Sequence, residues 1–116
     1  MIATDFFHDH CAGMSIKPDS LLPTEVVQAM RNDAVGHRLK LLRRALDKRP
    51  AEMADLLGIE RTYWSRFENG RQGLSDSVAA LLVINFGVTL DFLTLGRWEG
   101  LPVGLAHKMR NLPPEE

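Results

Sequence analysis

Two arginines in the middle of the chain have the type and spacing needed to contact DNA bases. Arg61 and Arg66 are five residues apart, in a segment that also holds Thr62. A guanidinium group can donate two hydrogen bonds to O6 and N7 of one guanine, and a threonine methyl group can contact a thymine methyl group. We expect both arginines to contact guanines in one groove, and Thr62 to contact a thymine methyl group or a phosphate. The alternative is that one arginine binds phosphate only, which carries no sequence information.

Two short helices are predicted to hold these side chains. The first covers residues 50–57 and starts with a proline, which suits a first helical turn and disfavours helical geometry at the residue before it. Gly58 can adopt the left-handed conformation that ends this helix, and the second helix covers residues 61–69. Trp64 and Phe67 are expected to face inward and the polar residues outward. Two helices joined by a tight glycine turn form a helix-turn-helix motif, which places its second helix in the major groove.

Further helices are predicted on both sides of this motif. The helix before the motif is expected to be capped by Asn32 or Asp33. A later helix is expected to be capped by Ser75 and ended by Gly87. Residues 90–93 are expected to form a short fifth helix. The apolar positions of the helix before the motif are Val35, Leu39, Leu42 and Leu46. Those of the helix after Ser75 are Val78, Leu81, Leu82 and Phe86. No stretch alternates as a strand does, so an all-α fold is predicted.

The positive charge of the chain is concentrated in one region. The 116 residues carry a net charge of −1, which does not by itself suggest a nucleic-acid-binding protein. Residues 31–50 contain seven basic and two acidic side chains and so carry +5, whereas residues 1–30 contain one basic and four acidic side chains and carry −3. Binding to phosphate depends on the local field. The basic run directly precedes the motif, which favours a DNA-binding surface over a merely solvated helix face.

The composition argues against several other classes of protein. The single cysteine, Cys11, cannot form an intramolecular disulfide bond and is typical of a reducing cytoplasm. No apolar run approaches the roughly 20 residues of a membrane helix, and the N-terminus lacks the pattern of a signal peptide. No phosphate-binding glycine loop and no recognisable grouping of Ser, His and Asp indicates catalysis. We expect a cytoplasmic binding protein that is not an enzyme and uses no cofactor.

The segment His8-Asp9-His10-Cys11 contains residue types that bind zinc. Four adjacent side chains cannot surround one tetrahedral ion well, and no second ligand pair occurs at finger-like spacing. We therefore expect a flexible tail here and no metal site. The alternative is a metal-responsive regulator that uses His8, His10 and Cys11.

Five short motifs occur in the order and spacing of a known protein family. They are Gly36-His37-Arg38-Leu39-Lys40, Met53-Ala54, Leu57-Gly58-Ile59, Glu68-Asn69-Gly70 and Gly87-Val88-Thr89-Leu90-Asp91-Phe92-Leu93. On these motifs the chain resembles, over about residues 34–96, the Xre/Cro-type helix-turn-helix family of phage and bacterial transcriptional regulators. The resemblance implies a five-helix repressor-like domain over residues 32–96. It leaves an N-terminal arm over residues 1–31 and a C-terminal extension over residues 97–116, each flexible or with a candidate short helix.

The resemblance also implies roles for single residues. Arg61, Thr62 and Arg66 match the positions of the recognition helix that face base edges. Arg43 and Glu68 match a buried ion pair that joins the first helix of the domain to the third. The residues expected at a dimer contact are Leu90, Phe92 and Leu93.

A second group of residues is expected to contact the DNA backbone. Asn69, Arg71 and Gln72 match family positions near phosphates. Tyr63 favours a phosphate or sugar contact over plain packing, and Ser65 is either a phosphate donor or simply small. The backbone-contacting set is Arg49, Tyr63, Ser65, Asn69, Arg71 and Gln72.

The chain departs from the family pattern at two positions. Pro50 stands where a phosphate-binding glutamine is common, so Arg49 takes over that contact or the contact is missing. Glu60 stands where Ser or Thr commonly caps the recognition helix. A carboxylate suits a helix N-terminus, but near DNA it must point away or accept from a cytosine amino group.

The residues together predict a sequence-specific regulator of transcription that binds double-stranded DNA, with repression as the expected role. It is expected to read a palindromic operator as a homodimer. The alternative is a protein-interaction module such as an antitoxin, whose N-terminal arm binds a partner protein. The apolar side chains that such an arm offers are Phe6, Phe7, Leu21 and Leu22.

Overall fold

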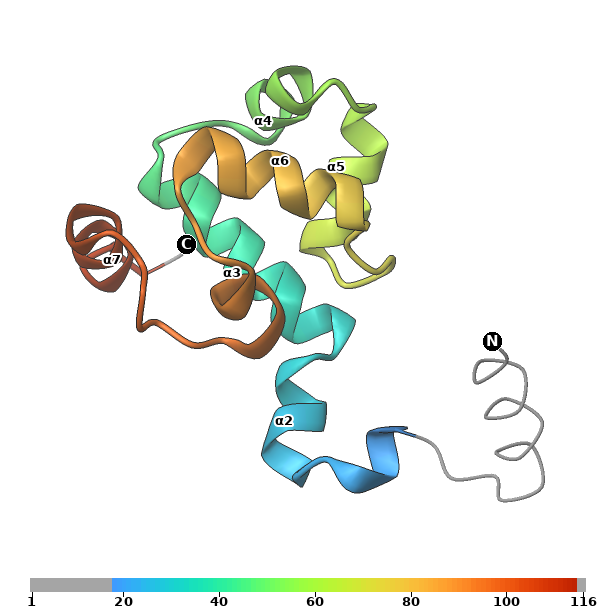
Figure 1. Ribbon diagram of the computed structural model, residues 1–116. Helices are drawn as coiled ribbons and strands as arrows, with labels where there is room; N and C mark the ends of the chain where they lie inside the picture. The colour runs from blue at the N-terminus through green and yellow to red at the C-terminus, as the bar shows by residue number, and fades with distance from the viewer. Residues whose placement is uncertain (1–17, 115–116) are drawn as a thin grey trace, which may run out of the picture.

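A computed structural model describes residues 18–114 of the chain. Within this range the fold is all-α, as predicted, and contains no strand. No helix in the same range is long and apolar enough to cross a membrane. The elements shown in Figure 1 are η1 (Pro18–Leu21), α2 (Thr24–Ala29), α3 (Asn32–Ala45), α4 (Pro50–Leu57), α5 (Arg61–Glu68), α6 (Asp76–Phe86), η2 (Asp91–Leu95) and α7 (Val103–Arg110).

The α4–turn–α5 unit confirms the predicted helix-turn-helix motif. Both helices have the predicted bounds, except that α5 ends one residue earlier. Gly58 is left-handed, with φ of 70°, and the Ile59 N–H donates to the carbonyl oxygen of Ala54 at 3.1 Å. Trp64 and Phe67 are buried, as predicted. Their burial turns the opposite side of α5 to solvent.

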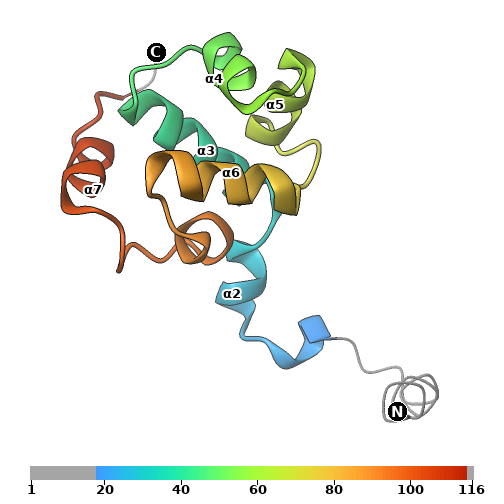
Figure 2. The same cartoon turned by 45° about the horizontal axis from the view of Figure 1, so that its top comes forward.

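Helix α3 is the central element of the fold and contacts α2, α5, η2 and α7. In Figures 1 and 2, α4 and α5 lie together at one end of the molecule and α2 projects from the other. Leu39 and Leu42 of α3 are fully buried. Gly36 lies where α3 crosses the end of α5, because a Cβ atom there would be 2.5 Å from the backbone oxygens of Phe67 and Glu68. A larger residue would push the two helices apart.

The predicted cap of the first domain helix is wrong. Helix α3 begins at Asn32 after Arg31, and no side chain caps its start. The carboxylate of Asp33 instead accepts hydrogen bonds from the N–H of Ala34 at 2.9 Å and from Nε of Arg31 at 3.4 Å. Asp33 is inside the first turn, so its side chain bonds to its neighbours and not back across the turn.

The predicted cap of α6 is confirmed, and its predicted apolar stripe is partly wrong. The Ser75 hydroxyl accepts from the N–H of Val78 at 3.3 Å. Val78 and Leu82 are buried, but Leu81 is exposed. Apolar residues occur on nearly every side of α6, so their spacing does not reveal which side meets the core.

The segment after residue 96 packs onto the domain. Leu101, Ala106 and Met109 are buried in the same core as the helices before them. The ring of Trp98 lies edge-on to Phe92 at a centroid distance of 5.3 Å. Helix α7 contacts α3, so the C-terminal extension completes the core on that side.

Candidate nucleic-acid interface

The outward side of α5 is a continuous polar surface. Arg61, Thr62, Ser65 and Arg66 are all exposed. A shallow hollow of about 200 Å³ follows this side of the helix into the loop after it. The residues that line the hollow are Thr62, Ser65, Arg66, Asn69 and Arg71.

The inward side of α5 is anchored by a buried ion pair. The side chains of Arg43 and Glu68 are only 12% and 7% exposed, and Nε of Arg43 donates to Oε2 of Glu68 at 2.5 Å. Nε1 of Trp64 donates to the same oxygen at 2.6 Å, and Nη1 of Arg43 donates to the carbonyl oxygen of Lys48 at 2.9 Å. These bonds join α3, α5 and the α3–α4 loop. They fix the rotation of α5, and with it the direction of its polar side.

Two contacts organise side chains on the outward surface of α5. The guanidinium of Arg66 lies over the ring of Tyr63, 5.9 Å from its centroid. Nδ2 of Asn69 donates to the hydroxyl of Ser65 at 3.3 Å. Tyr63 is exposed on this surface and is not part of the core. All four side chains can therefore be reached from solvent.

Arg61 is paired with a residue that the sequence analysis did not single out. Its Nη2 donates to Oδ2 of Asp55, on α4, at 3.1 Å. Glu60 precedes α5 as its N-cap residue, but its exposed side chain accepts no capping hydrogen bond. The Asp55–Arg61 pair could have been sought in the sequence because the opposite charges are six residues apart across the turn.

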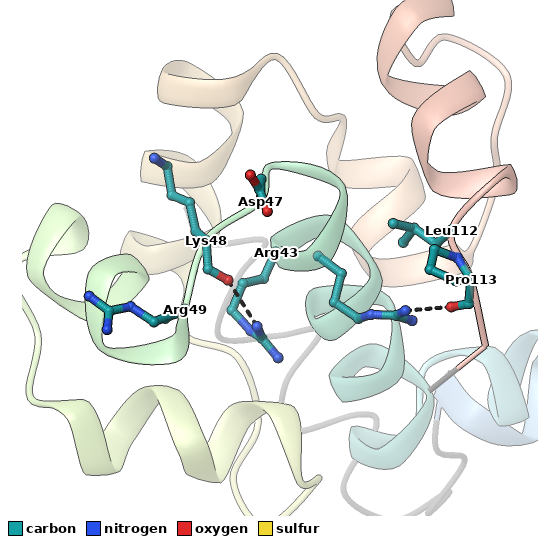
Figure 3. A pocket seen from close by; sticks show the side chains of 7 residues that line it. Arg43, Asp47, Lys48, Arg49, Leu112 and Pro113 are labelled. Carbon is teal, nitrogen blue, oxygen red and sulfur yellow. Dashed lines mark hydrogen bonds between the residues drawn. The ribbon is translucent and has the colours of Figure 1, made fainter. Parts of the chain in front are cut away.

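Arg49 helps to line a basic pocket at the junction of α3 and α4 (Figure 3). The pocket has a volume of about 370 Å³, and Nη2 of Arg44 donates to the carbonyl oxygen of Pro113 at its edge at 2.5 Å. The lining residues are Arg43, Arg44, Asp47, Lys48, Arg49, Leu112 and Pro113. The basic run of the sequence indicated this charge. The wall that the C-terminal segment contributes had no signal in the sequence.

The start of α4 is held by a carboxylate next to Arg49. Glu52 accepts a hydrogen bond from the backbone N–H of Arg49 at 2.8 Å. This bond lowers the pKa of the Glu52 carboxyl below its ordinary value. The side chain of Arg49 is exposed, and its Nε lies 3.6 Å from Oε1 of Glu52.

The model of a family described as a helix-turn-helix domain matches residues 34–91, which are half of the chain. The chain belongs to the helix-turn-helix family. This is the domain type of Xre/Cro-type regulators, so the resemblance seen in the sequence is confirmed. The family consists of DNA-binding proteins with regulatory roles and not, in general, of enzymes. Neither a curated protein sequence nor a solved structure matches the chain.

One part of the expected dimer contact of this helix-turn-helix protein needs correction. Phe92 and Leu93 are 0% exposed, whereas Leu90 is 54% exposed. Residues buried inside one protomer offer no surface to a second. Phe92 and Leu93 are core residues because η2 folds back onto α3, and of the three only Leu90 remains available.

Arg38 is not part of a phosphate-binding surface, although it belongs to the basic run. Its guanidinium donates to the carbonyl oxygen of Leu93 at 2.9 Å and to that of Ala29 at 2.7 Å. Burial lowers the pKa of this group. Arg38 therefore joins α2, α3 and η2.

Several residues named in the sequence analysis lie outside the described residues. They are Phe6, Phe7, His8, Asp9, His10 and Cys11. Among residues 18–114, no three His, Cys, Asp or Glu side chains are grouped as metal ligands.

Proposed function

We propose that the protein is a sequence-specific regulator of transcription that represses by binding a palindromic operator in double-stranded DNA. The observation that supports this most is the rigid mounting of an exposed polar helix. The buried bonds of Glu68 to Arg43 and Trp64 hold α5, while its opposite side presents Arg61 and Arg66 to solvent. A helix held in this way can enter a major groove without reordering its own core.

In this proposal Arg61, Thr62 and Arg66 contact base edges. Contacts with the DNA backbone surround them on three elements: the start of α4, α5, and the loop after α5. Backbone contacts fix the register of the protein on the duplex and supply most of the salt-dependent affinity. The residues assigned to them are Arg49, Tyr63, Ser65, Asn69, Arg71 and Gln72.

We propose further that the protein is a homodimer. Leu81 and Ile84 of α6 and Leu90 beside η2 are exposed apolar side chains, and α6 and η2 are neighbours in Figure 2. Exposed apolar side chains on adjoining elements favour association. A two-fold dimer would place two copies of α5 about one helical turn of DNA apart, roughly 34 Å, which requires a palindromic site. A cytoplasmic location and the absence of catalysis and cofactors complete the proposal.

The test is selection of bound duplexes from a random pool, followed by anisotropy measurements of the enriched duplex at several salt concentrations. We expect a palindrome. The logarithm of affinity should fall against the logarithm of salt with a slope of about −0.9 for each phosphate contact. An Arg61→Ala, Arg66→Ala double variant is the control and should bind DNA without enriching any sequence. Failure of the unaltered protein to enrich any duplex would contradict the proposal.

A second candidate is a protein-interaction module whose N-terminal arm binds a partner. The supporting observation is that α2 has no buried residue and that Leu21, Leu22 and Met30 around it are exposed. Leu21→Ser with Leu22→Ser should then abolish capture of a partner from cell extract while leaving DNA binding unchanged. Loss of DNA binding in that variant would argue against a separate interaction surface.

A further inference from the structure

The pair between Asp55 and Arg61 places a carboxylate on the side of the molecule proposed to face DNA. Asp55 is on α4 and Arg61 is the first residue of α5, and their side chains are 62% and 67% exposed. One hydrogen bond of 3.1 Å joins Oδ2 of Asp55 to Nη2 of Arg61. The contact therefore crosses the turn of the helix-turn-helix motif and joins its two helices by their side chains.

Stability does not explain why a carboxylate is placed here. Ion pairs this exposed change folding equilibria by at most about fivefold, and many change nothing measurable. A carboxylate near phosphates also weakens binding through repulsion. Glu52, on the same helix, has a structural role because it accepts from the backbone N–H of Arg49. The Asp55 carboxylate instead accepts its hydrogen bond from the guanidinium of Arg61.

Arg61 is a side chain whose direction matters. An arginine side chain has many rotamers, and at the first position of a helix few neighbours restrict it. If the Arg61 side chain is already held in one conformation, binding to DNA loses less conformational entropy. Asp55 occupies one of the five N–H donors of the guanidinium, which leaves a pair of donors for O6 and N7 of a guanine.

We propose that Asp55 is a positioning residue that sets the base specificity of Arg61. Its carboxylate holds the guanidinium above the first turn of α5, in the direction from which a base edge is reached. Asp55 itself makes no contact with DNA and lowers the overall affinity slightly through its charge. This inference rests on the proposed function, because it assigns the specificity of the same surface.

The test compares base preferences of the 116-residue chain and its variants, by sequencing the duplexes that each binds from one randomised pool. Asp55→Asn should lower the preference for guanine at one position of each half-site by about two- to fivefold, the range of an exposed ion pair. Affinity for unrelated duplexes should stay equal or rise. Asp47→Asn is the matched control, since it removes an exposed carboxylate beside Arg49, a residue assigned to the DNA backbone; it should change affinity for all sequences alike.

A double-mutant cycle shows whether the effect passes through Arg61. In an Arg61→Ala background, Asp55→Asn should cause no further change of base preference. Asp55→Ser provides a second variant, and the urea midpoint of each variant verifies that it is folded. Equal effects of Asp55→Asn and Asp47→Asn on base preference, or an unchanged preference in Asp55→Asn, would overturn the inference while leaving the proposed function intact. If the unaltered protein selects no sequence at all, both are overturned.

Discussion

Arg66 and Arg71 are both exposed arginines near the end of α5. Arg66 is expected to contact a base, and Arg71 is expected to contact the DNA backbone. Arg66 lies on the helix itself, with its guanidinium over Tyr63, whereas Arg71 lies in the following loop at the edge of the same hollow. A base contact contributes to the affinity for one sequence, and a phosphate contact contributes to the affinity for all sequences.

Arg66→Ala should therefore reduce discrimination at one base pair by about 1–3 kcal/mol. Arg71→Ala should weaken binding to every duplex and make the salt slope shallower by about 0.9. Anisotropy titrations with the selected duplex and its single-base variants measure both. Arg66→Lys is the control, because it keeps the charge and loses the two parallel donors. The reverse pattern for the two alanine variants would refute this assignment.

Glu68 is the residue whose loss should affect folding most directly. Its carboxylate accepts from Arg43 and Trp64 within the core. Glu68→Ala leaves the Arg43 cation buried without its partner, so the free energy of unfolding should fall by about 3–5 kcal/mol in urea denaturation. Arg31→Ala breaks the exposed pair of Arg31 with Asp33. This change should alter the free energy of unfolding by less than about 1 kcal/mol. Similar values for both variants would mean that the buried pair does not hold α5.

At the scale of elements, the crossing of α3 and α5 depends on a glycine. Helix propensity alone predicts that alanine stabilises any helical glycine position. Gly36→Ala should instead lower the free energy of unfolding by about 1–3 kcal/mol. The Cβ atom of the alanine would overlap two backbone oxygens, which cannot rotate away. Gly104→Ala in α7 is the matched control, since a Cβ atom added there would meet no atom within 4 Å beyond its chain neighbours and the backbone of its own helix. It should stabilise the fold by about 0.4–1 kcal/mol, and stabilisation by both changes would contradict the close crossing.

The start of α4 should make stability depend on pH. The hydrogen bond from the Arg49 N–H lowers the pKa of Glu52 in the folded state, below its ordinary value of 4.5. The ionised form is then favoured by folding, so this contribution is complete above pH 4.5 and is lost as the pH falls through the lower, folded-state pKa. Glu52→Gln should flatten the fall of the unfolding free energy in that acidic window, measured by urea denaturation at several pH values. An unchanged slope would show that the bond does not persist in solution.

At the scale of the whole molecule, the domain is larger than its family match. The match ends at residue 91, but Met109 of α7 is buried against the same core. Met109→Ala should lower the free energy of unfolding by about 2–5 kcal/mol, as for other large core residues. Val103→Ala, at an exposed position of the same helix, should change the free energy of unfolding by no more than about 0.5 kcal/mol. Equal thermal midpoints for the two variants would show that α7 is not part of the cooperative unit.

The sequence by itself determined the motif helices and which side of α5 is buried. Pro50 and Gly58 act on the backbone at their own positions, so they set where α4 begins and ends whatever surrounds them. Trp64 and Phe67 at helical spacing determined the buried side of α5 and left the polar residues outside. These features are local, and a local pattern is sufficient to predict them.

Only the tertiary structure decided which residues meet across the fold. It buried Phe92 and Leu93, which had been expected at a dimer contact, and it directed Arg38 to the carbonyl oxygens of Ala29 and Leu93. It also added the C-terminal segment to the core. An apolar or charged side chain has the same local pattern whether it meets the core, a partner or solvent. The outcome depends on where distant segments pack, and that is a property of the folded chain.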